Sequence, residues 1–219
     1  MKRSFFKYGV MAAMMLVAGF TFTACGDDED DPTEGVVTPG GDEDGDGEEN
    51  TSPIASASVV YPVQTANFAD MQAVADEIYV RYVDENNQVR QEPFTGKWEK
   101  NVEVPAVDGS CTVALQVIGV AKDDESLAAL SGDIRLRIDA SAVYGFNHVD
   151  GGKSDGWNLS AAVNNSYALP DGLDGMLNDF NSDKEKFGGI VFASCAQNDG
   201  GEHISPEAFW ETNKFVLGE

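Results

Sequence analysis

Two tryptophans are the side chains in this sequence best suited to hold a ligand. Trp98 lies between Lys97 and Lys100 in a stretch with the pattern of an exposed strand, and Trp157 lies in a glycine-rich stretch. A flat aromatic face can stack on a sugar ring, so these two are candidate ligand-stacking residues. Core packing is the alternative for each of them, and we expect it for Trp210, which lies on a short predicted helix.

The glycine-rich stretch, residues 145–158, also contains candidate ligands for a hard cation. Ca²⁺ prefers carboxylate and carbonyl oxygens, and these are offered by Asn147, Asp150, Asp155 and Asn158. Their spacing matches no calcium-binding loop, and a plain surface turn is the main alternative. We therefore expect no cofactor, with calcium as the one candidate.

We find no catalytic constellation in the sequence. It has no nucleophile-elbow pattern, and the two histidines, His148 and His203, have no recognisable partners. Residues 54–219 carry 26 acidic side chains, so a carboxylate pair for glycoside hydrolysis is available by chance alone. We therefore name no catalytic residue and favour binding over hydrolysis.

Strands dominate the elements that must position these side chains. Apolar and polar residues alternate in several segments, which is typical of strands with one face in water. Residues 111–120 are apolar on both faces and are predicted to lie at the centre of a sheet. The predicted strands are residues 56–63, 78–82, 101–104, 111–120, 133–142 and 189–196, and the predicted helices are residues 68–75, 173–180 and 207–213.

Short strands of this kind favour an all-β domain, an antiparallel immunoglobulin-like β-sandwich with a few short helices. The likeness to immunoglobulin domains is architectural, because no tryptophan follows shortly after Cys111 and Ala193 stands where a tyrosine corner would place its tyrosine. In the strand over residues 78–82, Tyr79 and Arg81 occupy the predicted wet face. Residues 144–188 are interpreted as an insertion of loops with one helix.

The N-terminus has a basic start, an uncharged run and then a cysteine. Residues 8–24 carry no charge, and Phe22, Thr23 and Ala24 precede Cys25. This pattern resembles the lipobox of bacterial lipoprotein signal peptides, from which it departs in having Phe22 where leucine is usual. The resemblance implies cleavage before Cys25 and attachment of acyl chains to it, which would hold the protein at a membrane. An uncleaved anchor helix and an ordinary secretory signal are the alternatives.

The segment after Cys25 is strongly acidic. Residues 26–31 are similar to the acidic export signal of surface lipoproteins of the Bacteroidetes type, which implies an outer-membrane lipoprotein exposed at the cell surface. Residues 27–52 carry 12 acidic and no basic side chains, so we predict a disordered tether. Within it, residues 42–47 imitate half of an EF-hand loop, but Pro53 stands where the bidentate glutamate is required.

These segments give three predicted regions: a lipoprotein signal peptide (1–24), the lipidated Cys25 with a disordered acidic linker (25–53), and one β-sandwich domain (54–219). An exported domain can form disulfides, so Cys111 and Cys195 are a candidate pair. Closing such a loop would stabilise the fold by about 4–5 kcal/mol. Two buried free thiols are the alternative.

The net charge of the chain is -24, with 38 acidic and 14 basic side chains. Nucleic acid is excluded as a partner, because phosphate contacts need clustered cations. We predict a surface-anchored lipoprotein whose non-catalytic β-sandwich binds an extracellular glycan or a partner envelope protein, with the membrane reached through the lipid anchor. The alternatives are a hydrolase in polysaccharide or peptide breakdown and a structural subunit associated with fimbriae or the envelope.

Overall fold

Eight strands form two antiparallel sheets in the part of the chain that the computed structural model describes, residues 52–181, 187–199 and 204–217. Sheet A has the strand order β4-β1-β6-β7, and sheet B has the order β3-β2-β5-β8. The strands of sheet A are β1 (Ile54–Gln64), β4 (Lys97–Pro105), β6 (Gly132–His148) and β7 (Lys153–Leu169). Those of sheet B are β2 (Ala75–Val83), β3 (Val89–Pro93), β5 (Cys111–Ala121) and β8 (Ile190–Asp199).

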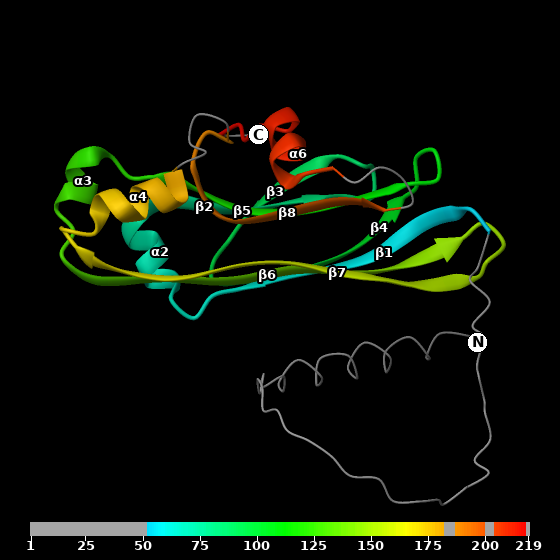
Figure 1. Cartoon of the computed structure of the whole chain (residues 1–219), viewed down its shortest axis with the longest axis horizontal. Coiled ribbons are helices and arrows are strands. Elements are labelled where there is room, and N and C mark those ends of the chain that lie inside the picture. The colour runs from blue at the N-terminus through cyan, green and yellow to red at the C-terminus, as the bar shows by residue number, and fades with distance from the viewer. Residues whose placement is uncertain (1–51, 182–186, 200–203, 218–219) are drawn as a thin grey trace, which may run out of the picture. The chain divides into compact units, whose positions relative to one another are not determined.

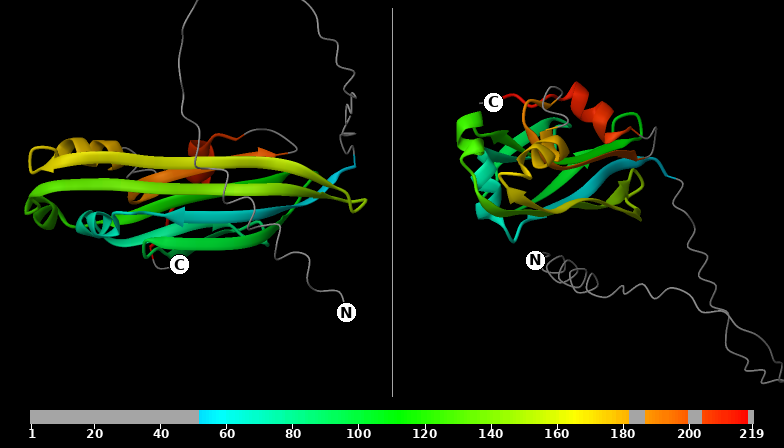
Figure 2. Two further views of the ribbon diagram at one scale, coloured as in Figure 1. Left: turned by 90° about the horizontal axis from the view of Figure 1, so that it is seen from below. Right: turned by 60° about the vertical axis from the view of Figure 1, so that its left-hand side comes forward.

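The two sheets lie as two layers, and the short helices of the described residues lie around them (Figure 1). The helix α6 lies over the outer face of sheet B, α4 packs against the edge strands β7 and β8, and α2 and α3 lie toward one end of the layers. Figure 2 (left) looks onto the outer face of sheet A, over which no described helix lies. The helices are α2 (Phe68–Val74), α3 (Asp124–Ala128), α4 (Leu173–Asn181) and α6 (Pro206–Thr212).

The core lies between the sheets and is built by alternation along each strand. In β6, the even-numbered residues from Ile134 to His148 are buried, while the residues between them lie on the outer face. Burying a side chain of the size of Leu136 or Ile138 stabilises the fold by about 1.5–3 kcal/mol. The predicted alternation over residues 133–142 is therefore confirmed within a longer strand.

Strand β5 is buried on both faces, as the sequence predicts. It lies between β2 and β8 in sheet B, and its run from Val113 to Gly119 is buried throughout. The inner face contacts the core, and the outer face lies on the side of sheet B that α6 covers (Figure 1). The same cover buries Arg81 on the neighbouring strand β2, which has an exposed fraction of only 4%. The predicted wet face of that strand is therefore wrong at Arg81.

The helices α2, α4 and α6 begin close to their predicted positions, whereas α3 was not predicted. Ser205 is the N-cap of α6, where its Oγ accepts a hydrogen bond from the N–H of Ala208 at 3.0 Å, and Pro206 is the first helical residue. Trp210 on this helix is completely buried, which confirms the prediction that it packs in the core.

The prediction of a loop-rich insertion over residues 144–188 is wrong in its first half. Strand β6 continues to His148, and β7 pairs with it from Lys153 to Leu169 as a long hairpin. Strand β7 lies at the edge of sheet A, and its inner side chains are only partly buried, among them Leu159, Ala161 and Val163. An edge strand of small and polar residues has a weak hydrophobic pattern, which explains why the sequence did not indicate it.

The mainly β architecture in two antiparallel sheets is confirmed, whereas its immunoglobulin-like character is not. In a constant-type immunoglobulin domain the first two strands are neighbours in one sheet. Here β1 pairs with β4 and β6, and β2 belongs to the other sheet.

The predicted signal peptide, Cys25, the acidic linker and the EF-hand-like residues 42–47 lie outside the described residues. Those regions remain predictions, as does the boundary of the domain at residue 54. Within the described ranges, no helix combines the length and the apolar character needed to span a bilayer.

Candidate functional site

The strand register of sheet A gathers polar residues into one row on its outer face. Ser58 of β1 lies opposite Glu103 of β4 and Gly145 of β6, and Gly145 lies opposite Asp155 of β7. Residues directly opposite each other in an antiparallel sheet point to the same face. The row therefore crosses all four strands on the face that the described helices leave open (Figure 2).

A hydrogen-bonded network fixes the Glu103 carboxylate in this row. Ser58 Oγ donates to Glu103 Oε2 at 2.8 Å, Asn147 Nδ2 donates to Oε1 at 2.6 Å, and Ser56 Oγ donates to the same oxygen. Desolvation alone would raise the pKa of Glu103, but these hydrogen bonds outweigh it and lower the pKa below its usual range. Glu103 is therefore a charged acceptor at neutral pH, held by three donors on two other strands.

The position beside Ser58 in the row carries no side chain. A Cβ atom added to Gly145 would meet nothing nearer than the Ser154 carbonyl oxygen at 3.4 Å, which is ordinary van der Waals contact. The backbone thus has room for a larger residue here, and glycine leaves the row open between Ser58 and Asp155. This opening is the part of the row where a ligand group could approach the backbone.

Trp157 lies beside the same row, next to a β-bulge. The register between β6 and β7 shifts between Val143 and Gly145, and a Cβ atom on Gly156 would lie 2.0 Å from the carbonyl oxygen of Tyr144. Only glycine permits this close approach of the two strands. The adjacent Trp157 has an exposed fraction of 64%, so its side chain is accessible from solvent.

Trp98, the other candidate for stacking, is partly buried and packs against the core. Its Nε1 donates to Glu92 Oε2 at 2.8 Å, and its ring centroid lies 5.1 Å from that of Tyr82. Glu92 also accepts hydrogen bonds from Tyr82 at 2.7 Å and from Lys100 at 2.8 Å. These contacts join β4 of sheet A to β2 and β3 of sheet B, so Trp98 closes one edge of the sandwich.

The four calcium candidates do not form a coordination shell. Asn147 donates into the Glu103 network, and Asp150 accepts the N–H of Gly152 at 2.8 Å in the hairpin turn. On β6, Asp155 lies opposite Gly145 and Asn158 lies opposite Val143. The described residues contain no group of three or more His, Cys, Asp or Glu side chains that could hold a metal ion.

The structure contradicts the candidate disulfide. Both Cys111 and Cys195 are free and buried. Cys111 lies opposite Asp199, whereas Cys195 lies opposite Leu115, four positions away along the ladder. Four positions correspond to about 13 Å at the rise of a strand, well beyond the Cα–Cα distance that a disulfide permits.

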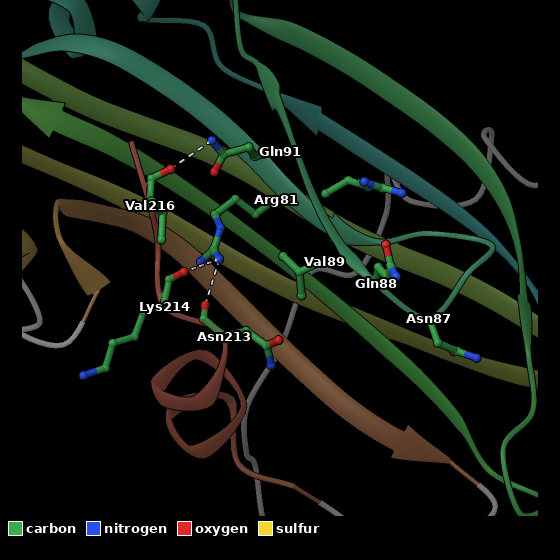
Figure 3. Close-up of a pocket in the computed structure, with 9 residues that line it drawn as sticks. Arg81, Asn87, Gln88, Val89, Gln91, Asn213, Lys214 and Val216 are labelled. Carbon is green, nitrogen blue, oxygen red and sulfur yellow. Dashed lines mark hydrogen bonds between the residues drawn. The ribbon is translucent and has the colours of Figure 1, made fainter. Parts of the chain in front are cut away.

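A second feature, a polar hollow of about 570 Å³, lies on the outer side of sheet B between β3 and the segment after α6 (Figure 3). Arg81 lines it together with residues of the β2–β3 turn and of the C-terminal segment. The alternating pattern of residues 78–82 placed Arg81 in water, so sequence reasoning missed this hollow.

No family model, no curated protein and no solved structure matches this chain. Its function is therefore inferred from the sequence and from the geometry of these two surfaces.

Proposed function

We propose that this protein is a lipoprotein of the outer membrane, exposed at the cell surface, whose β-sandwich domain binds an extracellular glycan on the outer face of sheet A without cleaving it. The observation that carries the proposal is an open sheet face with the ionised Glu103 at one end, fixed by hydroxyl and amide donors, and the exposed ring of Trp157 toward the other end.

The chemistry of this face suits a sugar. Sugar hydroxyls donate to a carboxylate such as Glu103 and exchange hydrogen bonds with amide side chains such as Asn147. The apolar face of a sugar ring stacks on an aromatic ring such as that of Trp157. A face whose polar groups already hold each other in place loses little side-chain entropy when a ligand binds.

The spacing of carboxylates in the row favours binding over hydrolysis. Glu103 and Asp155 lie at opposite ends of the row, with β1 and β6 between their strands. Three strand spacings separate them by about 14 Å. Glycoside hydrolysis needs two carboxyl groups about 5–9.5 Å apart, so this pair is too far apart to act on one bond.

The anchor is supported by the lipobox-like residues that precede Cys25 and by the acidic segment that follows them. Replacing Cys25 with alanine should move the protein from the membrane fraction into the soluble fraction. A variant that stays in the membrane fraction would contradict the lipid anchor, whatever the domain binds.

A glycan array probed with the purified full-length chain tests the ligand. We expect selective binding to one or more glycans, with affinity reduced about tenfold by Trp157→Ala and by Glu103→Gln, because each removes one of the two contacts. Leu217→Ala is the matched control, since Leu217 is similarly exposed, at 58%, but follows α6. Binding that survives both variants would refute the site, and release of shorter sugars would favour the hydrolase alternative.

A further inference from the structure

The hollow on sheet B has an unusual charge for this chain. Three of its nine lining residues are cationic, namely Arg81, Arg90 and Lys214, and none is acidic. The whole chain has 38 acidic and only 14 basic side chains. A cationic hollow in so acidic a protein is the surface on which an anion would concentrate.

Arg81 in the wall of this hollow has no carboxylate partner among the residues that the structure describes. Its guanidinium donates to Gln116 Oε1 at 2.7 Å and to the backbone carbonyls of Asn213 and Lys214 at 2.7 and 3.2 Å (Figure 3). All three acceptors are neutral. Burial lowers the pKa of Arg81 to about 10, so the side chain keeps its positive charge at neutral pH. A buried charge without a counter-charge is rare in folded proteins.

The rings next to Arg81 supply part of the missing compensation. The guanidinium carbon lies 4.9 Å from the ring centre of Trp210 and 5.8 Å from that of Phe215. Cation–π contacts of this kind stabilise the charge, but they accept none of its hydrogen bonds.

Three buried donors in this cluster lack an acceptor among the described residues. They are Arg81 Nε, Gln116 Nε2 and Trp210 Nε1. Gln116 lies opposite Arg81 in the β2–β5 ladder, and Trp210 stacks on its guanidinium, so the three belong to one place. A buried donor without an acceptor destabilises the fold. What the cluster lacks is an acceptor, and the charge of Arg81 favours a negative one.

We propose that this hollow binds a small oxyanion, a carboxylate, sulfate or phosphate group, with Arg81 as the binding residue and Lys214 adding positive charge at the rim, where Arg90 is already paired with Asp84. The site lies on the other sheet from the proposed glycan face, so it stands independently of that proposal. The planar guanidinium matches the geometry of all three groups. Gln116 and Trp210, which are buried behind the hollow, position Arg81.

The test titrates the purified full-length chain with sodium acetate, sulfate and phosphate at one ionic strength, maintained with sodium chloride. Calorimetry and the fluorescence of Trp210, whose ring contacts Arg81, follow binding, and the Tm is measured at each concentration. We expect saturable binding of at least one of the three anions, with a rise in Tm of a few degrees at saturation. The three arms identify which group the hollow prefers.

Two variants assign the binding to the hollow. Arg81→Gln should abolish it, and Lys214→Glu should weaken it about fivefold through charge reversal at the rim. Lys97→Glu, the same change on the exposed start of β4, is the matched control and should leave it unchanged. Arg81 also donates hydrogen bonds to the C-terminal segment, so Arg81→Gln could prevent folding. In that case the effect of Lys214→Glu on anion binding tests the proposal. Absence of saturable binding by all three anions, or equal binding by wild type and Lys214→Glu, would overturn the proposal.

Discussion

The turn between β2 and β3 depends on one buried carboxylate, Asp84. Its Oδ1 accepts the backbone N–H groups of Asn86 and Gln88 at 2.8 and 2.9 Å, and its Oδ2 accepts Arg90 Nε at 2.6 Å. Desolvation alone would raise the pKa of Asp84, but these bonds outweigh it and lower the pKa from 3.8 to about 2. The substitution Asp84→Asn keeps an oxygen for the turn and removes the charge that binds Arg90.

The expected loss of stability follows from the pKa. One pKa unit corresponds to about 1.4 kcal/mol, so a pKa lowered from 3.8 to about 2 represents about 2 kcal/mol at neutral pH. Arg90 is about half exposed, with 52% of its side chain accessible, and solvent screening reduces the value toward about 1 kcal/mol. We therefore expect Asp84→Asn to lower the free energy of unfolding by about 1–2 kcal/mol at pH 7.

The contribution of Asp84 to the free energy of unfolding depends on pH. The folded-state pKa of Asp84 lies below its unfolded value, so the contribution is fully present above about pH 4 and is lost as the pH falls toward about 2. Urea unfolding of wild type and Asp84→Asn at several pH values should show a difference that is constant from pH 7 to 5 and shrinks below pH 4. An Arg90→Gln background should remove most of the difference. A difference that does not change between pH 7 and 2.5 would refute the reasoning.

Three further perturbations follow from contacts in the two sheets. Gly156→Ala should destabilise the fold by about 2 kcal/mol, measured by urea unfolding, because its Cβ would lie 2.0 Å from a backbone carbonyl oxygen. Cys111 and Cys195, with burial raising the pKa of both thiols to about 11, should resist a thiol reagent at pH 8 until urea unfolds the chain. Trp98→Phe should cost about 1 kcal/mol in the same unfolding assay, since it removes the hydrogen bond to a carboxylate.

Controls separate these effects from general damage. Gly175→Ala in α4 should be neutral or slightly stabilising, because its Cβ would meet nothing within 4 Å. Equal destabilisation by Gly156→Ala and Gly175→Ala would contradict the bulge argument. Rapid labelling of Cys111 or Cys195 in the folded state would contradict their burial. If treatment with a reductant increased the number of thiols that can be labelled, the two cysteines would have to form a disulfide.

Local periodicity was enough to predict the elements whose burial is strong. Residues 111–120 are apolar on both faces and form the central strand β5, and the alternation over residues 133–142 lies within β6. Ser205 and Pro206 marked the start of α6 because capping is a local property. The weak pattern of β7, whose only fully buried residue is Leu169, could not be distinguished from a loop.

The features that depend on pairing between distant segments could not be predicted. Arg81 looked like a wet-face residue because the segment that buries it is more than 130 residues away in sequence. Glu103 meets Ser58 across 45 residues, and only the register of β1 and β4 brings them together. Cys111 and Cys195 lie on the same face of sheet B, but the register between β5 and β8 places them four residues apart along the strands.

The placement of β1 has a mechanical consequence under the proposed anchor at the N-terminus. Any pulling force carried by the residues before Ile54 enters the sheet through β1, which has hydrogen-bonded neighbours on both sides, β4 and β6. His148 on β6 adds a side-chain contact just before β1, because its Nδ1 lies 2.6 Å from the carbonyl oxygen of Ser52. Load arriving through an edge strand could peel one ladder from its end, bond by bond. Load on β1 meets two ladders at once, so the sheet on which we propose a glycan face is also the sheet that resists such a load.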